Sequence, residues 1–210
     1  MPCSPKSMPP GVAARCFIAV DVGDAVRREV TRVIATLTGK LEAVKTPPKV
    51  VWVKPVALHV TVRFLGEIEP PDVERLQEVL APAIALAPFE IEWRGIGTFP
   101  NNKQPRALWI GVVNGAAPLA RLEAEVSRRL AGGSVADLDD RPFLAHLTVG
   151  RVKMAGAGVD WPKILQAVEV KRVTTLVDRV TLYRSELMRG GPHYTGLVSA
   201  PLIGTVRNNE

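Results

Sequence analysis

Hydrophobic residues recur along the chain with two different spacings, which predicts a mixture of helices and strands. Several segments carry apolar side chains three and four positions apart, as one face of a helix requires. We expect Asp24 to be the N-cap of the first helix and Pro71 to lie in the first turn of the second. The expected helices cover about residues 24–41, 70–83, 118–131 and, as a shorter one, 161–168.

Short apolar runs separate these helices and predict strands, because they are rich in β-branched and aromatic residues. In this order the chain falls into two comparable halves, each with a long helix. The expected fold class is therefore α+β, with two pseudo-symmetric lobes, each an antiparallel sheet with flanking helices, which enclose a central cleft. The expected strands cover residues 15–22, a run that begins at 59, and the segments 89–99, 106–113, 143–152, 177–187 and 194–202.

The composition is that of a globular protein, with 210 residues of which 47% are hydrophobic and 23% charged. No apolar run approaches the roughly 20 residues needed to cross a bilayer, so we expect no membrane association. Residues 1–14 lack the apolar core of a signal peptide, and we expect a disordered leader followed by a single bilobal domain over residues 15–205. Cys3 and Cys16 suggest neither a disulfide framework nor a zinc site, so a reduced, cytoplasmic protein is expected.

The charge balance points mildly towards polyanionic partners, since the formal net charge is +6 and the isoelectric point is about 9.6. Charge alone leaves a nucleic-acid partner open, because arginine-rich proteins are common. No run of five or more like charges is present. Any basic binding surface must therefore be assembled by folding.

A short phrase, His-x-Thr-Val, occurs twice, in "HVTVRFLG" and in "HLTVGR". Residues two apart on a strand point to the same face, so His59 lies beside Thr61 and His146 beside Thr148. The intervening apolar residues would face the core. These phrases use two of only three histidines in the chain. If the lobes are related by an approximate twofold axis, the two imidazole–hydroxyl pairs face each other across the cleft.

Two imidazoles on opposite sides of a cleft can perform general acid–base catalysis, one taking a proton from water and the other protonating a leaving oxygen. A phosphodiester suits this arrangement, because in-line displacement puts the attacking and leaving oxygens on opposite sides of phosphorus. A lone histidine on a strand is more often a half-buried structural residue. The pairing of two such phrases argues against that interpretation. A metal site is disfavoured, because each phrase offers one ligand with no Cys, Asp or Glu beside it.

The third histidine shows how easily the three-letter pattern arises. His193 is followed by Tyr194 and Thr195, but a Gly-Gly-Pro turn precedes it and Gly196 follows, so we expect a loop residue. The prediction for His59 and His146 therefore rests on their place in apolar strands and on the repetition of the phrase, and not on the three letters alone. Tyr183 and Arg184, near the closing strand, could line the cleft, but core or surface roles are favoured.

At these residues the sequence resembles the 2H phosphoesterase superfamily, which is named for two H-x-[ST]-h motifs, where h is hydrophobic. Within it the chain is similar to the RNA 2′,3′-cyclic phosphodiesterases, formerly called 2′-5′ RNA ligases. Besides the paired motifs, "RCFIAVDV", "GIGTFPNNKQPRALWIGV" and "VTLYRSELMRGGPHYTGL" resemble segments of that family in the same order. The resemblance extends over residues 15–202.

The resemblance implies hydrolysis of a terminal 2′,3′-cyclic phosphate on RNA to a 2′-phosphate, with no metal and no cofactor. The reverse joining of a cyclic end to a 5′-hydroxyl through a 2′-5′ bond is also implied. In this chain His59 would be the proton donor and His146 the proton acceptor, although a symmetric site could operate in either direction. Thr61 and Thr148 would bind the phosphate oxygens. A monomer is expected.

Three further residues are candidate substrate contacts. Arg151 matches a phosphate-contacting arginine of the family, but strand alternation puts it on the wrong face, so a strand end or bulge is required there. Phe17 could stack on the terminal base, with core packing an equal alternative. Arg63, where the family often has Lys, could reach substrate from the cleft rim, with a solvated or ion-paired strand residue an equal alternative.

One departure from the family pattern is Ala145, which replaces a Pro directly before the second motif. Two other functions stay open. One is a phosphodiesterase for small cyclic nucleotide phosphates, and the other is an RNA- or nucleotide-binding module without catalysis. The presence of both histidines and both threonines argues against the second.

Overall fold

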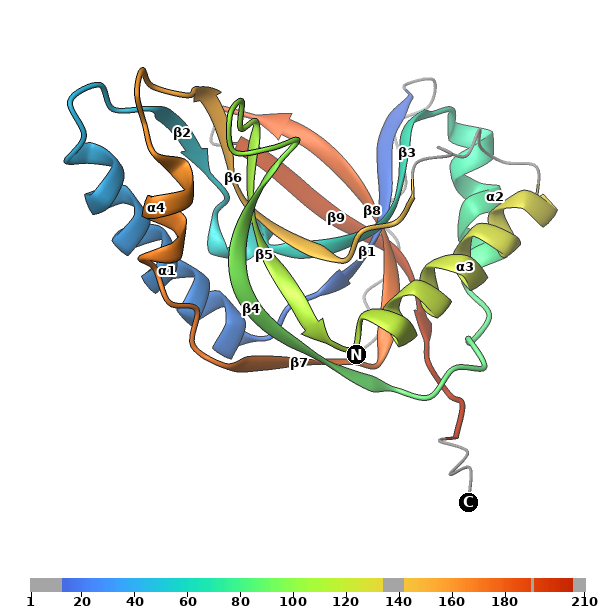
Figure 1. Cartoon of the computed structure of the whole chain (residues 1–210). Coiled ribbons are helices and arrows are strands. Elements are labelled where there is room, and N and C mark those ends of the chain that lie inside the picture. Colours follow the sequence, from blue (N-terminus) through green and yellow to red (C-terminus); the bar gives the residue numbers. More distant parts are fainter. Residues whose placement is uncertain (1–12, 134–141, 190, 206–210) are drawn as a thin grey trace.

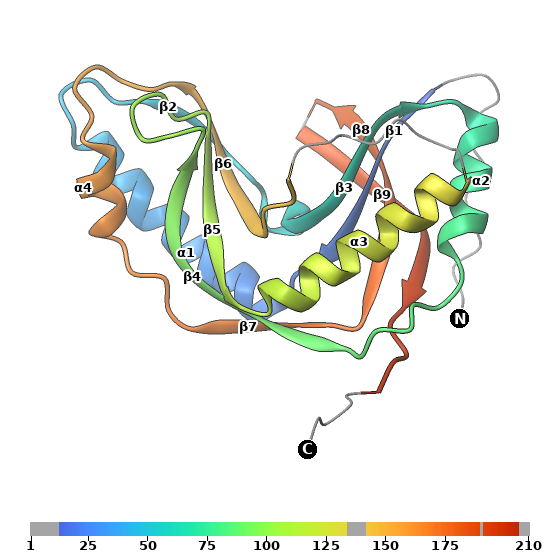
Figure 2. The ribbon, with the colours of Figure 1, turned by 45° about the vertical axis from the view of Figure 1, so that its right-hand side comes forward.

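The fold consists of two antiparallel sheets that diverge from a common base, as seen in a computed structural model that describes residues 13–133, 142–189 and 191–205. Sheet A has the spatial order β3 (His59–Ile68), β1 (Ala14–Asp21), β8 (Arg179–Met188) and β9 (Gly191–Pro201). Sheet B has the order β2 (Lys49–Trp52), β6 (His146–Met154), β5 (Ala107–Asn114), β4 (Phe89–Phe99) and β7 (Val173–Val177). Figure 2 shows the two sheets as the arms of a V. The predicted α+β fold with two lobes is confirmed.

The helices divide between the sheets, and the division is not the one the sequence halves suggest. α2 (Pro70–Leu80) and α3 (Ala116–Gly133) lie with sheet A and form lobe A (Figure 1). α1 (Asp24–Glu42) and α4 (Trp161–Gln166) lie with sheet B and form lobe B. The first long helix thus leaves sheet A to pack in lobe B, and α3 leaves sheet B to pack in lobe A. A short 3₁₀ turn, η1 (Pro55–Ala57), precedes β3.

Both long helices bury a single apolar stripe, as their hydrophobic spacing predicts. In α1 the stripe includes Val26, Val30, Val33, Leu37 and Leu41. In α3 it consists of Leu119, Leu122, Val126 and Leu130, each of which is fully buried. These stripes pack into one continuous core that runs through both lobes.

Several predicted boundaries require correction. Asp24 is the first residue of α1 and Gly23 is its N-cap, so Asp24 acts on the helix dipole and caps nothing. Ala14 already lies buried in β1, whereas the predicted leader extended to residue 14; residues 1–12 lie outside the described part of the chain. His193 belongs to β9, opposite Glu186, because the hairpin of β8 and β9 continues to Gly191. None of the helices in the described ranges is long and apolar enough to span a membrane.

Candidate active site

The two histidines of the repeated phrase occupy equivalent places in the fold. His59 is the first residue of β3 and His146 is the first residue of β6. β3 and β6 approach each other at the base of the V, where the two lobes meet (Figure 2). On both strands the burial alternates as predicted, with His and Thr half-buried and the following Val or Leu buried. The repeat therefore contributes one imidazole from each lobe to the junction.

Each imidazole is held by the same backbone hydrogen bond. Nδ1 of His59 lies 2.9 Å from the carbonyl oxygen of Ala57, and Nδ1 of His146 lies 2.7 Å from that of Leu144. A carbonyl oxygen only accepts, so both Nδ1 atoms must carry a proton and donate it. This arrangement fixes the tautomer and makes Nε2 the atom that exchanges protons with a ligand.

Each imidazole also rests against a phenylalanine from its own lobe. The ring centroids of Phe17 and His59 are 4.7 Å apart, and those of Phe99 and His146 are 4.9 Å apart. Phe17 is only 4% exposed, since His59 and two tyrosines cover its ring. This packing fits the alternative of a core residue, and the stacking of Phe17 on a base stays a prediction. Phe99 is its counterpart in lobe B, and the sequence analysis missed it.

Two tyrosines complete the surroundings of His59: Tyr183, for which a place at the cleft was the less favoured alternative, and Tyr194, which was not predicted to be there. The Tyr194 ring meets His59 edge-on at 5.2 Å, and the hydroxyl of Tyr183 donates a 2.7 Å hydrogen bond to Oδ2 of Asp21. Together with Phe17 they line a small cavity of about 90 Å³ that opens beside the imidazole. Only the pairing of β1, β8 and β9 brings these residues together, so no local sequence signal could have found them.

Burial sets the proton affinity of both imidazoles. The pKa of His59 is lowered chiefly by desolvation and also by the positive charge of Arg151, while the Ala57 carbonyl and the carboxylate of Asp21 oppose the shift. Desolvation likewise lowers the pKa of His146, opposed by the hydrogen bond to Leu144. Within the part of the chain that the structure describes, no acidic side chain contributes at His146. The carboxylate of Asp21 beside His59 therefore distinguishes the surroundings of the two imidazoles.

Arg151 reaches the cleft through the β-bulge that the sequence required. In the pairing of β5 with β6, Leu108 faces Gly150 while Trp109 faces Thr148, so one extra residue of β6 is accommodated between them. The bulge reverses the alternation of faces beyond Val149. The charge of Arg151 influences both His59 and Tyr194 in the opposite lobe. The irregular register therefore accounts for Arg151 lying on the same side of β6 as His146 and Thr148, which strict strand alternation would not allow.

The guanidinium group of Arg63 is bound by two side chains of α3. Its guanidinium lies 2.5 Å from the carboxylate of Glu123 on α3 and also donates to the hydroxyl of Ser127. Both members of the ion pair are largely buried. This contact fits the ion-paired alternative for Arg63, and its contact with substrate stays a prediction.

The two threonines follow their histidines on the same faces of β3 and β6. Thr61 pairs with Ala19 of β1, and Thr148 pairs with Trp109 of β5. The ring of Trp109 lies over Gly97, where a Cβ atom would come within 2.2 Å of it. Glycine at that position lets the indole pack beneath Phe99, whose centroid is 5.2 Å away. Lobe B thus supports its imidazole through a stack of two aromatic rings.

The geometry supplies two proton-transfer groups and hydroxyl donors near a positive charge. Within the described ranges, no three His, Cys, Asp or Glu side chains gather as a set of metal ligands. Such a site can activate a water on one side of a bound anion and protonate a leaving oxygen on the other. Two-sided acid–base catalysis on a phosphodiester is the chemistry that these groups fit.

Comparison with known proteins identifies the class to which this fold and site belong. A family model described as the 2′-5′ RNA ligase superfamily matches residues 16–188. The chain therefore belongs to the 2′-5′ RNA ligase superfamily. The family resemblance found in the sequence is confirmed.

Particular relatives carry a more specific name. A protein of Archaeoglobus fulgidus named RNA 2′,3′-cyclic phosphodiesterase is 40% identical over 139 residues, which cover 66% of this chain and 73% of the relative. A protein of the same name from Methanothermobacter thermautotrophicus is 34% identical over 187 residues, covering 87% of this chain and 96% of the relative.

Solved structures share the fold over nearly the whole chain. A crystal structure described as a phosphoesterase superimposes with a TM-score of 0.67 at 25% identity, covering 90% of this chain and 98% of the other. E. coli LigT complexed with 3′-AMP also gives a TM-score of 0.67, with the same coverage, at 24% identity. The likeness to LigT shows the fold alone.

Proposed function

We propose that this protein hydrolyses the terminal 2′,3′-cyclic phosphate of RNA to a 2′-phosphate. A water oxygen bonds to phosphorus as the bond from phosphorus to the 3′-oxygen breaks, which leaves a 2′-phosphomonoester and a 3′-hydroxyl. Nε2 of His146 takes the proton of the water, and Nε2 of His59 gives its proton to the departing 3′-oxygen. The observation that carries the proposal is the matched fixing of both imidazoles through Nδ1, one from each lobe. The names of the relatives support the substrate.

The assignment of acid and base is supported by the surroundings of the two rings. A general acid must be protonated before reaction, and the carboxylate of Asp21 favours the charged form of His59. Among the described residues no carboxylate acts on His146, and desolvation of this half-buried ring favours the neutral form that a base requires. Each positioned acid or base contributes about 10²–10⁴ to the rate.

The phosphate oxygens are proposed to bind between the hydroxyls of Thr61 and Thr148, with Arg151 balancing their negative charge. Replacing water by a 5′-hydroxyl as the nucleophile would join two RNA ends through a 2′-5′ bond with the same pair of histidines. The histidines supply both proton transfers, so the proposal needs no metal or other cofactor. Both catalytic strands come from one chain, so a monomer suffices.

The test is hydrolysis of an oligoribonucleotide that ends in a 2′,3′-cyclic phosphate, measured in EDTA. We expect His59→Ala and His146→Ala each to lower kcat/KM by about 10²–10⁴. His193→Ala is the matched control, since His193 is exposed on β9, and it should keep full activity. Chromatography should show a 2′-phosphate product.

An inactive parent protein would rule out the enzymatic proposal. Activity that is lost in EDTA would overturn only the metal-free mechanism. Equal losses in all three histidine variants would show that the repeated phrase has no special role.

A further inference from the structure

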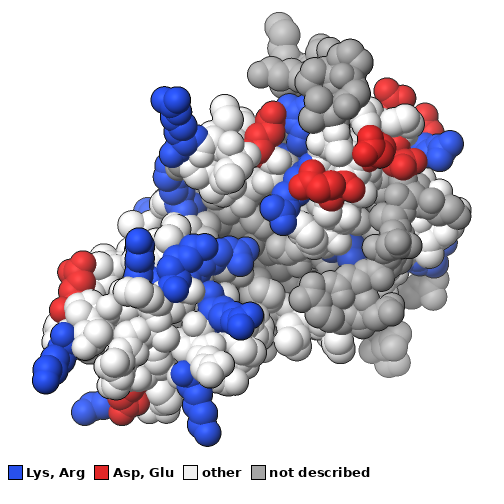
Figure 3. Space-filling view, turned by 90° about the horizontal axis from the view of Figure 1, so that it is seen from above, with Lys and Arg blue, Asp and Glu red and all other residues white. Residues whose placement is uncertain are grey.

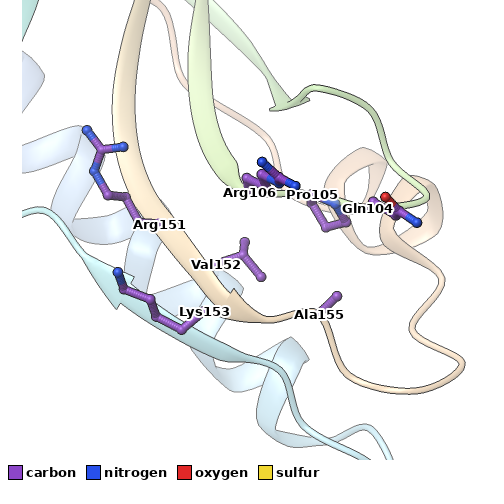
Figure 4. A pocket seen from close by; sticks show the side chains of 7 residues that line it. All are labelled: Gln104, Pro105, Arg106, Arg151, Val152, Lys153 and Ala155. Atoms are coloured by element: carbon purple, nitrogen blue, oxygen red, sulfur yellow. The ribbon is translucent and has the colours of Figure 1, made fainter.

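A second hollow lies beside the candidate active site, on lobe B. It has a volume of about 450 Å³ and is lined by the end of β6 and by the loop between β4 and β5. We call it the basic groove, after its three cationic residues Arg106, Arg151 and Lys153 (Figure 4). Gln104 adds a neutral amide from the loop. None of the described residues that line it is acidic.

The cationic groups of the groove are available to a ligand. Arg106, Arg151 and Lys153 are all exposed, and within the described ranges no carboxylate forms an ion pair with any of them. Viewed from above, Lys and Arg side chains gather on the part of this face that belongs to lobe B, while the Asp and Glu side chains of that lobe lie at its margin (Figure 3). Such a cluster favours phosphate groups.

The backbone of the groove is held in place before any ligand binds. The amide of Arg106 donates to the carbonyl of Phe99 at 2.7 Å, and the carbonyl of Arg106 accepts from Val152 at 2.9 Å. In the loop, the side-chain oxygen of Asn101 accepts from the backbone amides of Lys103 and Gln104 at 2.9 and 3.0 Å. A preformed site loses little conformational entropy on binding.

The groove continues directly from the proposed catalytic site. Arg151 belongs to both, since it lines the groove and its charge reaches His59. Lys153 lies two residues further along β6 and lines the same groove as Arg151. It is the extra residue at a second irregularity, where Lys49 pairs with Met154 and Val50 with Val152. Arg106 faces the same hollow from the loop.

We propose that the basic groove binds the phosphodiester on the 5′ side of the terminal nucleotide of a single-stranded RNA. This inference rests on the proposed function. A cyclic phosphate closes the 3′ end of the chain, so the rest of an RNA substrate leaves the site only from the 5′ side of that nucleotide. The groove makes an oligoribonucleotide a better substrate than a cyclic mononucleotide, which has no phosphate to place there.

The experiment compares kcat/KM for two substrates: a short oligoribonucleotide ending in a 2′,3′-cyclic phosphate, and a 2′,3′-cyclic mononucleotide with a 5′-hydroxyl. Arg106→Ala and Lys153→Ala should each lower the ratio of oligonucleotide to mononucleotide by about two- to fivefold. Each should also reduce the salt dependence of oligonucleotide binding by about 0.7 in the log–log slope. Arg28→Ala and Lys163→Ala remove exposed cations from the helices of lobe B and should leave the ratio unchanged.

An unchanged ratio in both groove variants would overturn the inference while leaving the proposed function intact. Equal effects in the two helix controls would also overturn it, because they would indicate a general effect of net charge. If neither substrate is hydrolysed, the proposed function fails. Fluorescence anisotropy of a labelled RNA oligonucleotide with the same variants then decides whether the groove binds phosphodiesters.

Discussion

Single residues set the chemistry of this site through the contacts that hold each imidazole. His59 and His146 share a backbone acceptor two residues earlier and a phenylalanine against the ring. They differ in charge environment, because Asp21 and Arg151 act on His59, whereas no charged side chain among the described residues acts on His146. The two histidines are therefore equivalent in geometry and distinct in proton affinity.

The lowered pKa values predict an acidic optimum for the free enzyme. Desolvation moves both histidines below their usual pKa of about 6.5. The proposed mechanism needs one neutral and one protonated imidazole, so the bell-shaped profile of kcat/KM should have its maximum below about pH 6.5. A bound phosphate anion favours the protonated forms, so the profile of kcat should be centred at a higher pH. Steady-state kinetics across about pH 4.5–9 would reveal both profiles.

Two substitutions near His59 should move the same limb of that profile in opposite directions. Arg151→Ala removes a positive charge that lowers the pKa of His59, so the limb should move to higher pH. Asp21→Asn removes the opposing negative charge and keeps an oxygen that accepts from the Tyr183 hydroxyl. The same limb should therefore move to lower pH in this variant. Shifts in the same direction would contradict the electrostatic roles assigned to Asp21 and Arg151.

Secondary-structure elements are joined in lobe B by a largely buried carboxylate on α1. Glu29, 7% exposed, accepts hydrogen bonds from Arg32 at 2.6 and 2.9 Å and from the backbone amide of Lys171 at 2.7 Å. Arg32 also donates to the carbonyl of Glu169. The pair fastens α1 to the segment that leads into β7.

Substitution of Glu29 should destabilise the fold in a pH-dependent way. The hydrogen bonds of Arg32 lower the pKa of Glu29, so its stabilisation is complete above its unfolded-state pKa of about 4.3 and is lost as the pH falls through the folded value. We expect Glu29→Ala to lower the free energy of unfolding by about 1–3 kcal/mol at pH 7. The difference from wild type should shrink at acidic pH in urea titrations. Glu42→Ala, at the exposed end of α1, should change little.

The elements themselves were largely predictable from local pattern. Long helices and the strands that carry the repeated phrase have enough apolar residues at regular spacing to be identified alone. β2 and β7 were missed, since they are only four and five residues long and gain their hydrogen bonds from β6 and β4. Phe99 and Tyr194 were missed as site residues, and Tyr183 was favoured as a core or surface residue, because the local sequence does not show which face of a sheet an aromatic residue presents to the cleft.

The whole molecule is held together by the exchange of its long helices. α1 follows β1 of sheet A but packs in lobe B, and α3 follows β5 of sheet B but packs in lobe A. Each lobe is thus completed by a helix that follows a strand of the other lobe's sheet. We expect neither lobe to fold without the other.

Unfolding should therefore be a single cooperative transition. All four tryptophans lie in lobe B, on β2, β4, β5 and α4, so their fluorescence reports that lobe, whereas far-UV circular dichroism reports both. The two urea transitions should coincide. Leu122→Ala in α3 of lobe A should lower the midpoint seen by fluorescence, with a loss of about 2–5 kcal/mol. Separate midpoints, or a Leu122→Ala effect confined to circular dichroism, would contradict the coupling.

The sequence by itself determined the α+β class, the two lobes, the family and the four polar residues of the repeated phrase. The class and the shared faces of the repeated phrase follow from hydrophobic period and from the alternation of strand faces, both of which are local properties. The two lobes follow from the repeat, and the family follows from the resemblance of the quoted motifs. Tertiary structure decided which helix packs on which sheet, that Phe17 supports His59 and that Glu123 holds Arg63. It also decided that a bulge turns Arg151 towards the cleft. Those outcomes depend on contacts between segments far apart in the chain, so the local pattern could not specify them.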